Sequence, residues 1–150
     1  MRAPFALITG MAITAALLPV VSATHTKDPT MNPAVYFEIP VQDMERAMRF
    51  YSAVFGFDFT RETLHGNEMA LFPLSAEAEG ISGGLAKGDI YKPSKDGTLI
   101  YLHTPDIDAT LAKAMAAGGT MLFPKTQAGT YGFVAEFADS EGNRIGLSQR

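Results

Sequence analysis

The feature that most constrains the fold of this chain is an internal repeat. When the sequence is compared with itself at an offset of 63 residues, Asp43 falls on Asp106 and Gly56 falls on Gly119. In the same register the apolar segment 35–39 overlays segment 98–102. A repeat of this kind indicates one supersecondary unit used twice, in which each copy buries an apolar face that it cannot bury alone.

An amphipathic helix is predicted near the start of each half. Apolar residues recur at the spacing of one helical face over 44–55 and again over 107–117. These residues are Met44, Ala47, Met48, Tyr51 and Phe55 in the first helix, and Ile107, Leu111, Ala114 and Met115 in the second. Asp43 and Asp106 precede the two helices as N-caps, and glycine follows each helix as a stop signal.

Three short extended segments follow each helix. They cover 57–64, 69–73 and 82–87 in the first half, and 120–124, 133–138 and 144–149 in the second. Each half is therefore a βαβββ module, one at about 34–87 and one at about 98–149, joined by segment 88–97. The predicted fold class is α+β, with one curved eight-stranded mixed sheet and both helices on its convex face.

Strand alternation predicts which side chains face the concave side of this sheet. If Val35, Phe37 and Ile39 lie under a helix, their neighbours Tyr36 and Glu38 face the concavity. The same rule, applied to the fifth and eighth strands, places five more residues on the concave face: Leu99, Tyr101, His103, Arg144 and Gly146. We expect a ligand to bind on this face, with Tyr36, Leu99, Tyr101, Arg144 and Gly146 as its binding residues.

Two motifs resemble those of the vicinal oxygen chelate superfamily, which includes glyoxalases, bleomycin-resistance proteins and extradiol dioxygenases. The segment from Val41 to Gly56 resembles the opening of such a module, and the segment from Asp139 to Ile145 resembles its closing turn. The resemblance covers about 33–149 and implies the paired βαβββ fold. Segments 97–102 and 143–147 look most like an uncharacterised branch related to lactoylglutathione lyases.

The resemblance also implies where a metal would be held, because the metal enzymes of the superfamily place ligands on the first and fourth strands of each module. Those positions here are Tyr36, Gly83 or its neighbour Gly84, Leu99 and Gly146. Ni, Zn, Fe and Mn need imidazole or carboxylate ligands, which these side chains do not supply. We therefore predict no metal ligands and no cofactor. The alternative is a divalent metal at displaced ligands, such as Glu38, His103 and Glu136.

The polar and aromatic candidates each have a functional and a structural interpretation. Glu38 and Arg144 would be a base and an anion clamp, or an ordinary salt bridge across the cavity. His103 would be a general acid or base, or a histidine that is hydrogen-bonded or solvated at a strand end. Tyr36 and Tyr101 suit an aromatic or amphipathic ligand, or serve packing alone.

Composition excludes several classes of function. The formal net charge is −4 and no basic cluster occurs, so we predict no nucleic-acid partner. The chain has no cysteine, which excludes disulfides, thiolate catalysis and cysteine-bound metals.

The first 33 residues differ from the repeat. Residues 1–23 resemble a signal peptide, with Arg2, an apolar stretch over 5–21 and small residues ending at Ala23. Residues 24–33 are predicted to be a linker and 34–150 the domain. Cleavage would make the protein periplasmic or secreted, whereas a start at Met31 would make it cytoplasmic. Polar residues and Pro19 dilute the apolar stretch, so no stable membrane span is expected.

Taken together, these patterns predict a metal-independent small-molecule-binding protein whose reaction is unknown. One alternative is a metal-dependent glyoxalase-like lyase or dioxygenase. A second alternative is a non-enzymatic protein that sequesters a drug or metabolite. The expected partner is a small-molecule ligand, and a homodimer is compatible with this prediction.

Overall fold

Aspartate side chains begin both helices. In the computed structural model, Asp43 accepts a hydrogen bond of 2.9 Å from the backbone N–H of Arg46, and helix α1 runs over Met44–Phe55. Asp106 accepts a bond of 3.1 Å from the N–H of Ala109, and α2 runs over Ile107–Ala116. Gly56 ends α1 at φ 76°, a conformation that glycine adopts without steric cost. The predicted helices and their N-caps are confirmed.

The structure describes residues 34–77 and 80–150. The predicted leader, 1–23, and the predicted linker, 24–33, lie outside the described residues. Within those two ranges, no helix is both long enough and apolar enough to cross a membrane.

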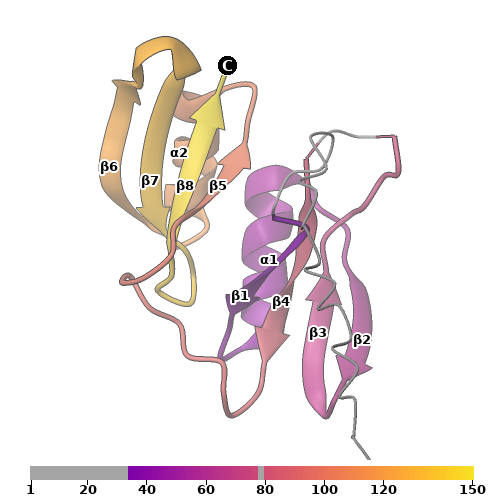
Figure 1. Ribbon diagram of the computed structural model, residues 1–150. Coiled ribbons are helices and arrows are strands. Elements are labelled where there is room, and N and C mark those ends of the chain that lie inside the picture. Colours follow the sequence, from indigo (N-terminus) through magenta and orange to yellow (C-terminus); the bar gives the residue numbers. More distant parts are fainter. Residues whose placement is uncertain (1–33, 78–79) are drawn as a thin grey trace, which may run out of the picture. The chain divides into compact units, whose positions relative to one another are not determined.

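Eight strands form two four-stranded mixed sheets (Figure 1). The first sheet has the order β1-β4-β3-β2, with β1 at Tyr36–Pro40, β2 at Thr60–Leu64, β3 at Asn67–Leu71 and β4 at Ser82–Lys87. The second has the order β5-β8-β7-β6, with β5 at Ile100–His103, β6 at Thr120–Gln127, β7 at Phe133–Ala138 and β8 at Arg144–Gln149. A short 3-10 helix, η1 at Gly129–Tyr131, precedes β7. The two sheets repeat one topology, which confirms the α+β fold of two βαβββ modules.

The two sheets are not joined into the single eight-stranded sheet expected from the sequence. β1 and β5 are the inner edges, and no ladder of hydrogen bonds joins them among the described strands. Phe37 and Leu102 line one cavity, and Ile39 and Ile100 line another, so residues of both strands border the same two cavities. Two cavities and the side chains that line them thus lie between β1 and β5, where backbone hydrogen bonds would be needed to form one continuous sheet.

Side chains of both modules form one shared core. In Figure 1 both helices lie behind the sheets, and α1 contacts α2. The rings of Phe50 from α1 and Phe137 from β7 lie 5.9 Å apart between their centroids. The expected apolar stripe of α1 did not include Phe50 or Val54, yet both are buried. α1 buries a wider face than its own sheet requires, because it also packs against the second module.

Val35 does not join the core as expected. It lies before the start of β1, and its side chain is 69% exposed. Phe37 and Ile39 do face the helix side, as the strand alternation predicts.

The turn from Asp139 to Asn143 connects the second module to the first. The hydroxyl of Tyr51 on α1 donates a bond of 2.8 Å to Asp139, and the Asn143 amide donates one of 2.8 Å to the carbonyl of Pro40. Burial raises the pKa of Asp139, and it raises the pKa of Tyr51 well above its ordinary value. The turn whose sequence resembles the closing turn of a superfamily module therefore forms a contact between the two modules.

The carboxylate of Glu141 in the same turn holds the start of α1. It accepts hydrogen bonds of 3.0 Å from the backbone N–H groups of Gln42 and Asp43, and Arg46 donates to it from Nε at 2.7 Å. Burial alone would raise the pKa of Glu141, but Arg46 and the two N–H donors together lower it. A carboxylate at a helix N-terminus is favourable because unpaired N–H groups carry partial positive charge there.

Candidate ligand-binding site

In the second sheet, a tyrosine ring lies against a glycine. Tyr101 on β5 is the register partner of Gly146 on β8. A Cβ atom at Gly146 would lie 2.5 to 2.8 Å from three atoms of the Tyr101 ring. Since real Cβ atoms do not approach so closely, glycine at this position allows the ring to lie against β8. Tyr101 remains 47% exposed, so part of its ring is accessible to a ligand.

In the first sheet, a tyrosine hydroxyl lies over the corresponding glycine. Glu38 on β1 is the partner of Gly84 on β4, and a Cβ atom at Gly84 would lie 2.9 Å from the Tyr36 hydroxyl oxygen. Gly83 faces the opposite side, where a Cβ atom would lie 2.1 Å from the carbonyl oxygen of Phe37. The counterpart of Gly146 is therefore Gly84, and the repeat offset shortens by one residue before this strand. Burial, and then Glu38, raise the pKa of Tyr36.

The expected pair of Glu38 and Arg144 does not form. Arg144 contacts one oxygen of Glu136, Oε2, with Nε at 2.7 Å and Nη2 at 2.5 Å. Glu38 instead accepts a hydrogen bond of 2.8 Å from Tyr91 in segment 88–97, and this bond raises the pKa of Tyr91. Arg144 pairs with Glu136 because their strands, β8 and β7, are neighbours in one sheet, whereas Glu38 belongs to the other sheet.

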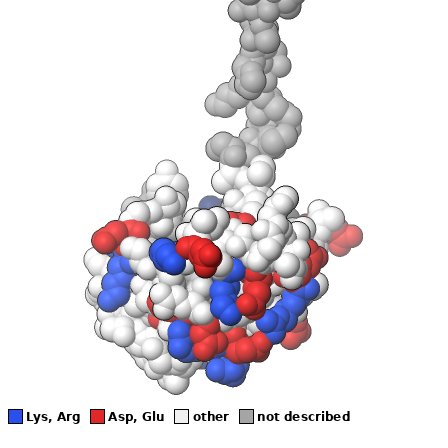
Figure 2. All heavy atoms as spheres, turned by 90° about the horizontal axis from the view of Figure 1, so that it is seen from below, with Lys and Arg blue, Asp and Glu red and all other residues white. Residues whose placement is uncertain are grey.

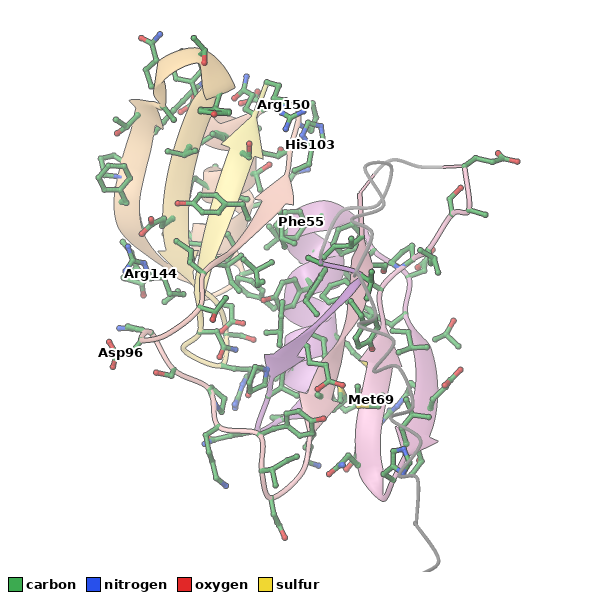
Figure 3. The ribbon with its side chains drawn as sticks, viewed as in Figure 1. Phe55, Met69, Asp96, His103, Arg144 and Arg150 are labelled. Atoms are coloured by element: carbon green, nitrogen blue, oxygen red, sulfur yellow. The ribbon has the colours of Figure 1, made fainter. Side chains whose placement is uncertain are left out.

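The remaining predicted site residues divide between two cavities. A cavity of about 560 Å³ includes Leu99, Tyr101 and His103, and a smaller one of about 240 Å³ includes Glu38 and Arg144. Tyr36 and Gly146 lie outside the linings of both. In Figure 3, His103 and Arg144 lie toward opposite ends of the second sheet, as expected when β5 ends at His103 and the parallel strand β8 begins at Arg144.

The larger cavity has a mainly apolar lining that comes from both modules. It is lined by Phe37, Phe57, Phe72, Pro73, Gly80, Ile81, Ser82, Leu99, Ile100, Tyr101, Leu102 and His103. Three phenylalanine rings from the first module therefore face the fifth strand of the second. Binding cavities are often of this size and character, with apolar walls and a small number of polar groups.

The family positions for a metal do not fit a metal here. Tyr36, Gly84, Leu99 and Gly146 supply no imidazole or carboxylate, and the ring of Tyr101 lies beside Gly146. The displaced set of Glu38, His103 and Glu136 is also not brought together. Throughout residues 34–77 and 80–150, no group of three or more histidine, cysteine, aspartate or glutamate side chains is placed to hold an ion.

The charges on the face shown in Figure 2 are mixed. Lysine and arginine side chains are interspersed with aspartate and glutamate over that face. Several charged side chains of the first sheet form ion pairs, among them Lys87 with Glu68 at 2.8 Å. These contacts lower the pKa of Glu68 and raise that of Lys87.

Comparison with known proteins decides the family. The sequence model of the Glyoxalase/Bleomycin resistance protein/Dioxygenase superfamily matches residues 34–147. The chain belongs to this superfamily. Its two βαβββ modules and its closing turn at Asp139 to Asn143 are thus the superfamily's own architecture, as the sequence resemblance implied.

Several known proteins are similar to the chain. A glyoxylase-like domain-containing protein from Didymella fabae is 29% identical over 117 residues, which cover 75% of this chain and 90% of that protein. The crystal structure of TnmS3, an antibiotic binding protein from Streptomyces sp. CB03234, is 27% identical with a TM-score of 0.56, and the match covers 80% of this chain and 97% of that one. A glyoxalase I mutant from Zea mays matches with 17% identity and a TM-score of 0.57. The match covers 78% of this chain but only 46% of the maize chain.

Two residues that contact predicted site residues received little or no weight from the sequence, namely Glu136, which binds Arg144, and Tyr91, which binds Glu38. In the sequence Glu136 alternates with Ala135 and Phe137 and could therefore face the concavity, but it was given less weight there than Glu38. Tyr91 lies in the segment between the modules, where periodicity predicts nothing. A signal for Glu136 was present in the sequence, whereas the position of Tyr91 required the structure.

Proposed function

We propose that this chain binds a small organic molecule in the cavity of about 560 Å³, without a metal ion. The observation that carries the proposal is the lining of that cavity, in which Phe37, Phe57 and Phe72 face Leu99 and Tyr101. Apolar walls favour an apolar or aromatic ligand through burial of its surface. His103 and Ser82 add polar atoms that would orient the ligand.

Two further observations support binding over a metal-dependent lyase or dioxygenase reaction. The positions that hold metal in the metal enzymes of this superfamily supply no imidazole or carboxylate, so we assign no reaction step to a metal. TnmS3, which is 27% identical over nearly its whole length, is described as an antibiotic binding protein. We extend that class of ligand to this chain and propose that it sequesters or carries an antibiotic-like metabolite.

A thermal-shift screen of small metabolites and antibiotics tests this function. A ligand that binds only the folded state raises the unfolding midpoint. The variant Leu99→Trp should abolish the shift, because a larger side chain at Leu99 fills the cavity from a position outside the strands and the core. Leu64→Trp is the matched control, since Leu64 is exposed on β2 and away from this cavity.

Two results would contradict the proposal. The first is a hit that shifts both variants as it shifts the wild type, which would place its site elsewhere. The second is a midpoint that rises with one of Ni, Zn, Fe or Mn and with no organic compound. The homodimer remains a prediction, which analytical ultracentrifugation with and without a hit would test.

A further inference from the structure

One row of residues crosses the second sheet on its concave face. Tyr101 on β5 pairs with Gly146 on β8, Gly146 pairs with Glu136 on β7, and Glu136 pairs with Phe123 on β6. Residues that are direct register partners point to the same face of a sheet. A carboxylate and a glycine therefore lie between two aromatic side chains, and Tyr101 and Phe123 are 47% and 40% exposed.

The strand that carries Phe123 is irregular at that residue. The register of β6 against β7 shifts between Met121 and Phe123 and again between Phe123 and Thr126. Such irregularities bend an edge strand and redirect individual side chains, and they occur often beside binding sites. Here they leave Phe123 as the direct partner of Glu136.

Glu136 is the polar centre of the row, and its two oxygens differ. The residue is only 7% exposed. Its Oε2 atom accepts from both Nε and Nη2 of Arg144, whereas its Oε1 atom accepts one hydrogen bond from the described residues, from the Tyr101 hydroxyl at 3.5 Å. A carboxylate oxygen can accept two hydrogen bonds of about 2.6–3.0 Å. Oε1 therefore retains acceptor capacity between two aromatic side chains, on a residue that is nearly buried.

From this arrangement we propose that the row formed by Tyr101, Gly146, Glu136 and Phe123 binds a neutral planar aromatic molecule that carries a hydroxyl or amino donor on its ring. The ring stacks on Tyr101 and Phe123, and the donor binds Oε1 of Glu136. The ligand is neutral because Arg144 already balances the charge of Glu136. The inference rests on the proposed function, since Tyr101 also lines the cavity of about 560 Å³.

A pair of probes that differ in one donor tests the row. 2-Naphthol has a hydroxyl donor, whereas 2-methoxynaphthalene has the same ring system without it. Their dissociation constants are measured from probe fluorescence, to which the protein contributes little because it has no tryptophan. We expect the wild type to bind 2-naphthol about ten- to hundredfold more tightly, as a hydrogen bond to a charged acceptor allows.

The double variant Glu136→Leu, Arg144→Leu removes the carboxylate without leaving either charge unpaired. Replacing a whole ion pair by apolar side chains is often tolerated. We expect it to erase the preference for 2-naphthol and to leave 2-methoxynaphthalene binding within about threefold, the range of ordinary packing changes. The control is Glu68→Leu, Lys87→Leu, an ion pair of the first sheet, which should leave both constants unchanged. Phe123→Ala, at an exposed position, should weaken both probes by about two- to tenfold.

The inference fails if the wild type binds the two probes equally or binds neither, or if the double variant weakens both alike. Equal binding of the two probes by the wild type, together with a thermal-shift hit that depends on Leu99, would separate the two proposals. In that case the cavity would still bind ligand, and only the role of Glu136 would be wrong.

Discussion

The N-termini of the two helices share an aspartate cap, but a different kind of side chain binds the remaining backbone N–H groups in each module. Both helices begin at an aspartate cap, but α1 also receives the carboxylate of Glu141 from the other module. α2 receives a neutral side chain from its own module, because Gln149 on β8 accepts a bond of 3.0 Å from the N–H of Ile107. The N-terminus of the first helix is therefore completed by the other module, whereas that of the second is completed within its own module.

The concave faces of the two sheets also carry different side chains at equivalent positions. The row of the first sheet runs from Glu38 to Gly84, Leu71 and Thr60, with its carboxylate on the inner strand and engaged by Tyr91. The row of the second sheet has its carboxylate on the third strand, between two aromatic residues. Equivalent backbone positions thus carry different chemistry, and we place the aromatic ligand on the second module for this reason.

The largest expected effect tests the dependence of the first module on the turn. Asp139→Ala should lower the free energy of unfolding by about 3–5 kcal/mol, because it leaves the buried Tyr51 hydroxyl and the N–H groups of Glu141 and Asn143 without their acceptor. Asp106→Ala removes only a cap and should cost about 1 kcal/mol. Urea unfolding measures both values, and equal costs would contradict the asymmetry.

A smaller effect is expected at Glu141, and it should depend on pH. Glu141→Gln should cost about 1–2 kcal/mol at pH 7, since hydrogen bonds to a charged acceptor are the stronger ones. The pKa of Glu141 is lowered in the folded protein. Its contribution is therefore complete above the unfolded pKa of about 4.3 and is lost as pH falls through the lower folded pKa.

The difference between Glu141→Gln and wild type should consequently shrink below about pH 4. Asp108→Asn, in the first turn of α2 and paired with Lys125 on the surface, should cost less than about 0.5 kcal/mol. Urea unfolding at several pH values provides the comparison. If the difference in unfolding free energy between Glu141→Gln and wild type widened toward low pH, the lowered pKa of Glu141 would be contradicted.

The smallest stability effects, and the sharpest contrast in binding, are expected at the two concave glycines. Gly146→Ala places a methyl group where the Tyr101 ring lies, so the ring must move and 2-naphthol binding should fall about tenfold. Gly84→Ala meets the Tyr36 hydroxyl at 2.9 Å in the other sheet and should leave 2-naphthol binding within about twofold. Gly84→Ala should change stability by about 1 kcal/mol or less, because the displaced hydroxyl ends a partly exposed side chain. Gly146→Ala meets ring carbons that include Cγ of Tyr101, and it should cost about 0.5–1.5 kcal/mol, as for a side chain forced off its rotamer. Equal losses of 2-naphthol binding in Gly146→Ala and Gly84→Ala would contradict our placement of the ligand on the second sheet.

Much of the fold was predictable because it depends on local patterns. The helix bounds at Met44 and Ile107 follow from apolar periodicity and aspartate caps, and the core positions of Ile39, Ile145 and Leu147 follow from strand alternation. The partner of Arg144 was not predictable. Alternation says which face a side chain occupies, but it does not say which of two carboxylates on that face lies nearer.

The sequence by itself determined the repeated module, the family and the identity of the concave residues, because periodicity, caps and turn motifs act over a few neighbouring residues. Only the tertiary structure decided that the sheets stay separate, that Glu136 rather than Glu38 holds Arg144, and that the turn at Asp139 anchors α1. Those contacts depend on strand order and on packing between modules. Both are set by the chain as a whole, through residues that lie far apart in the sequence.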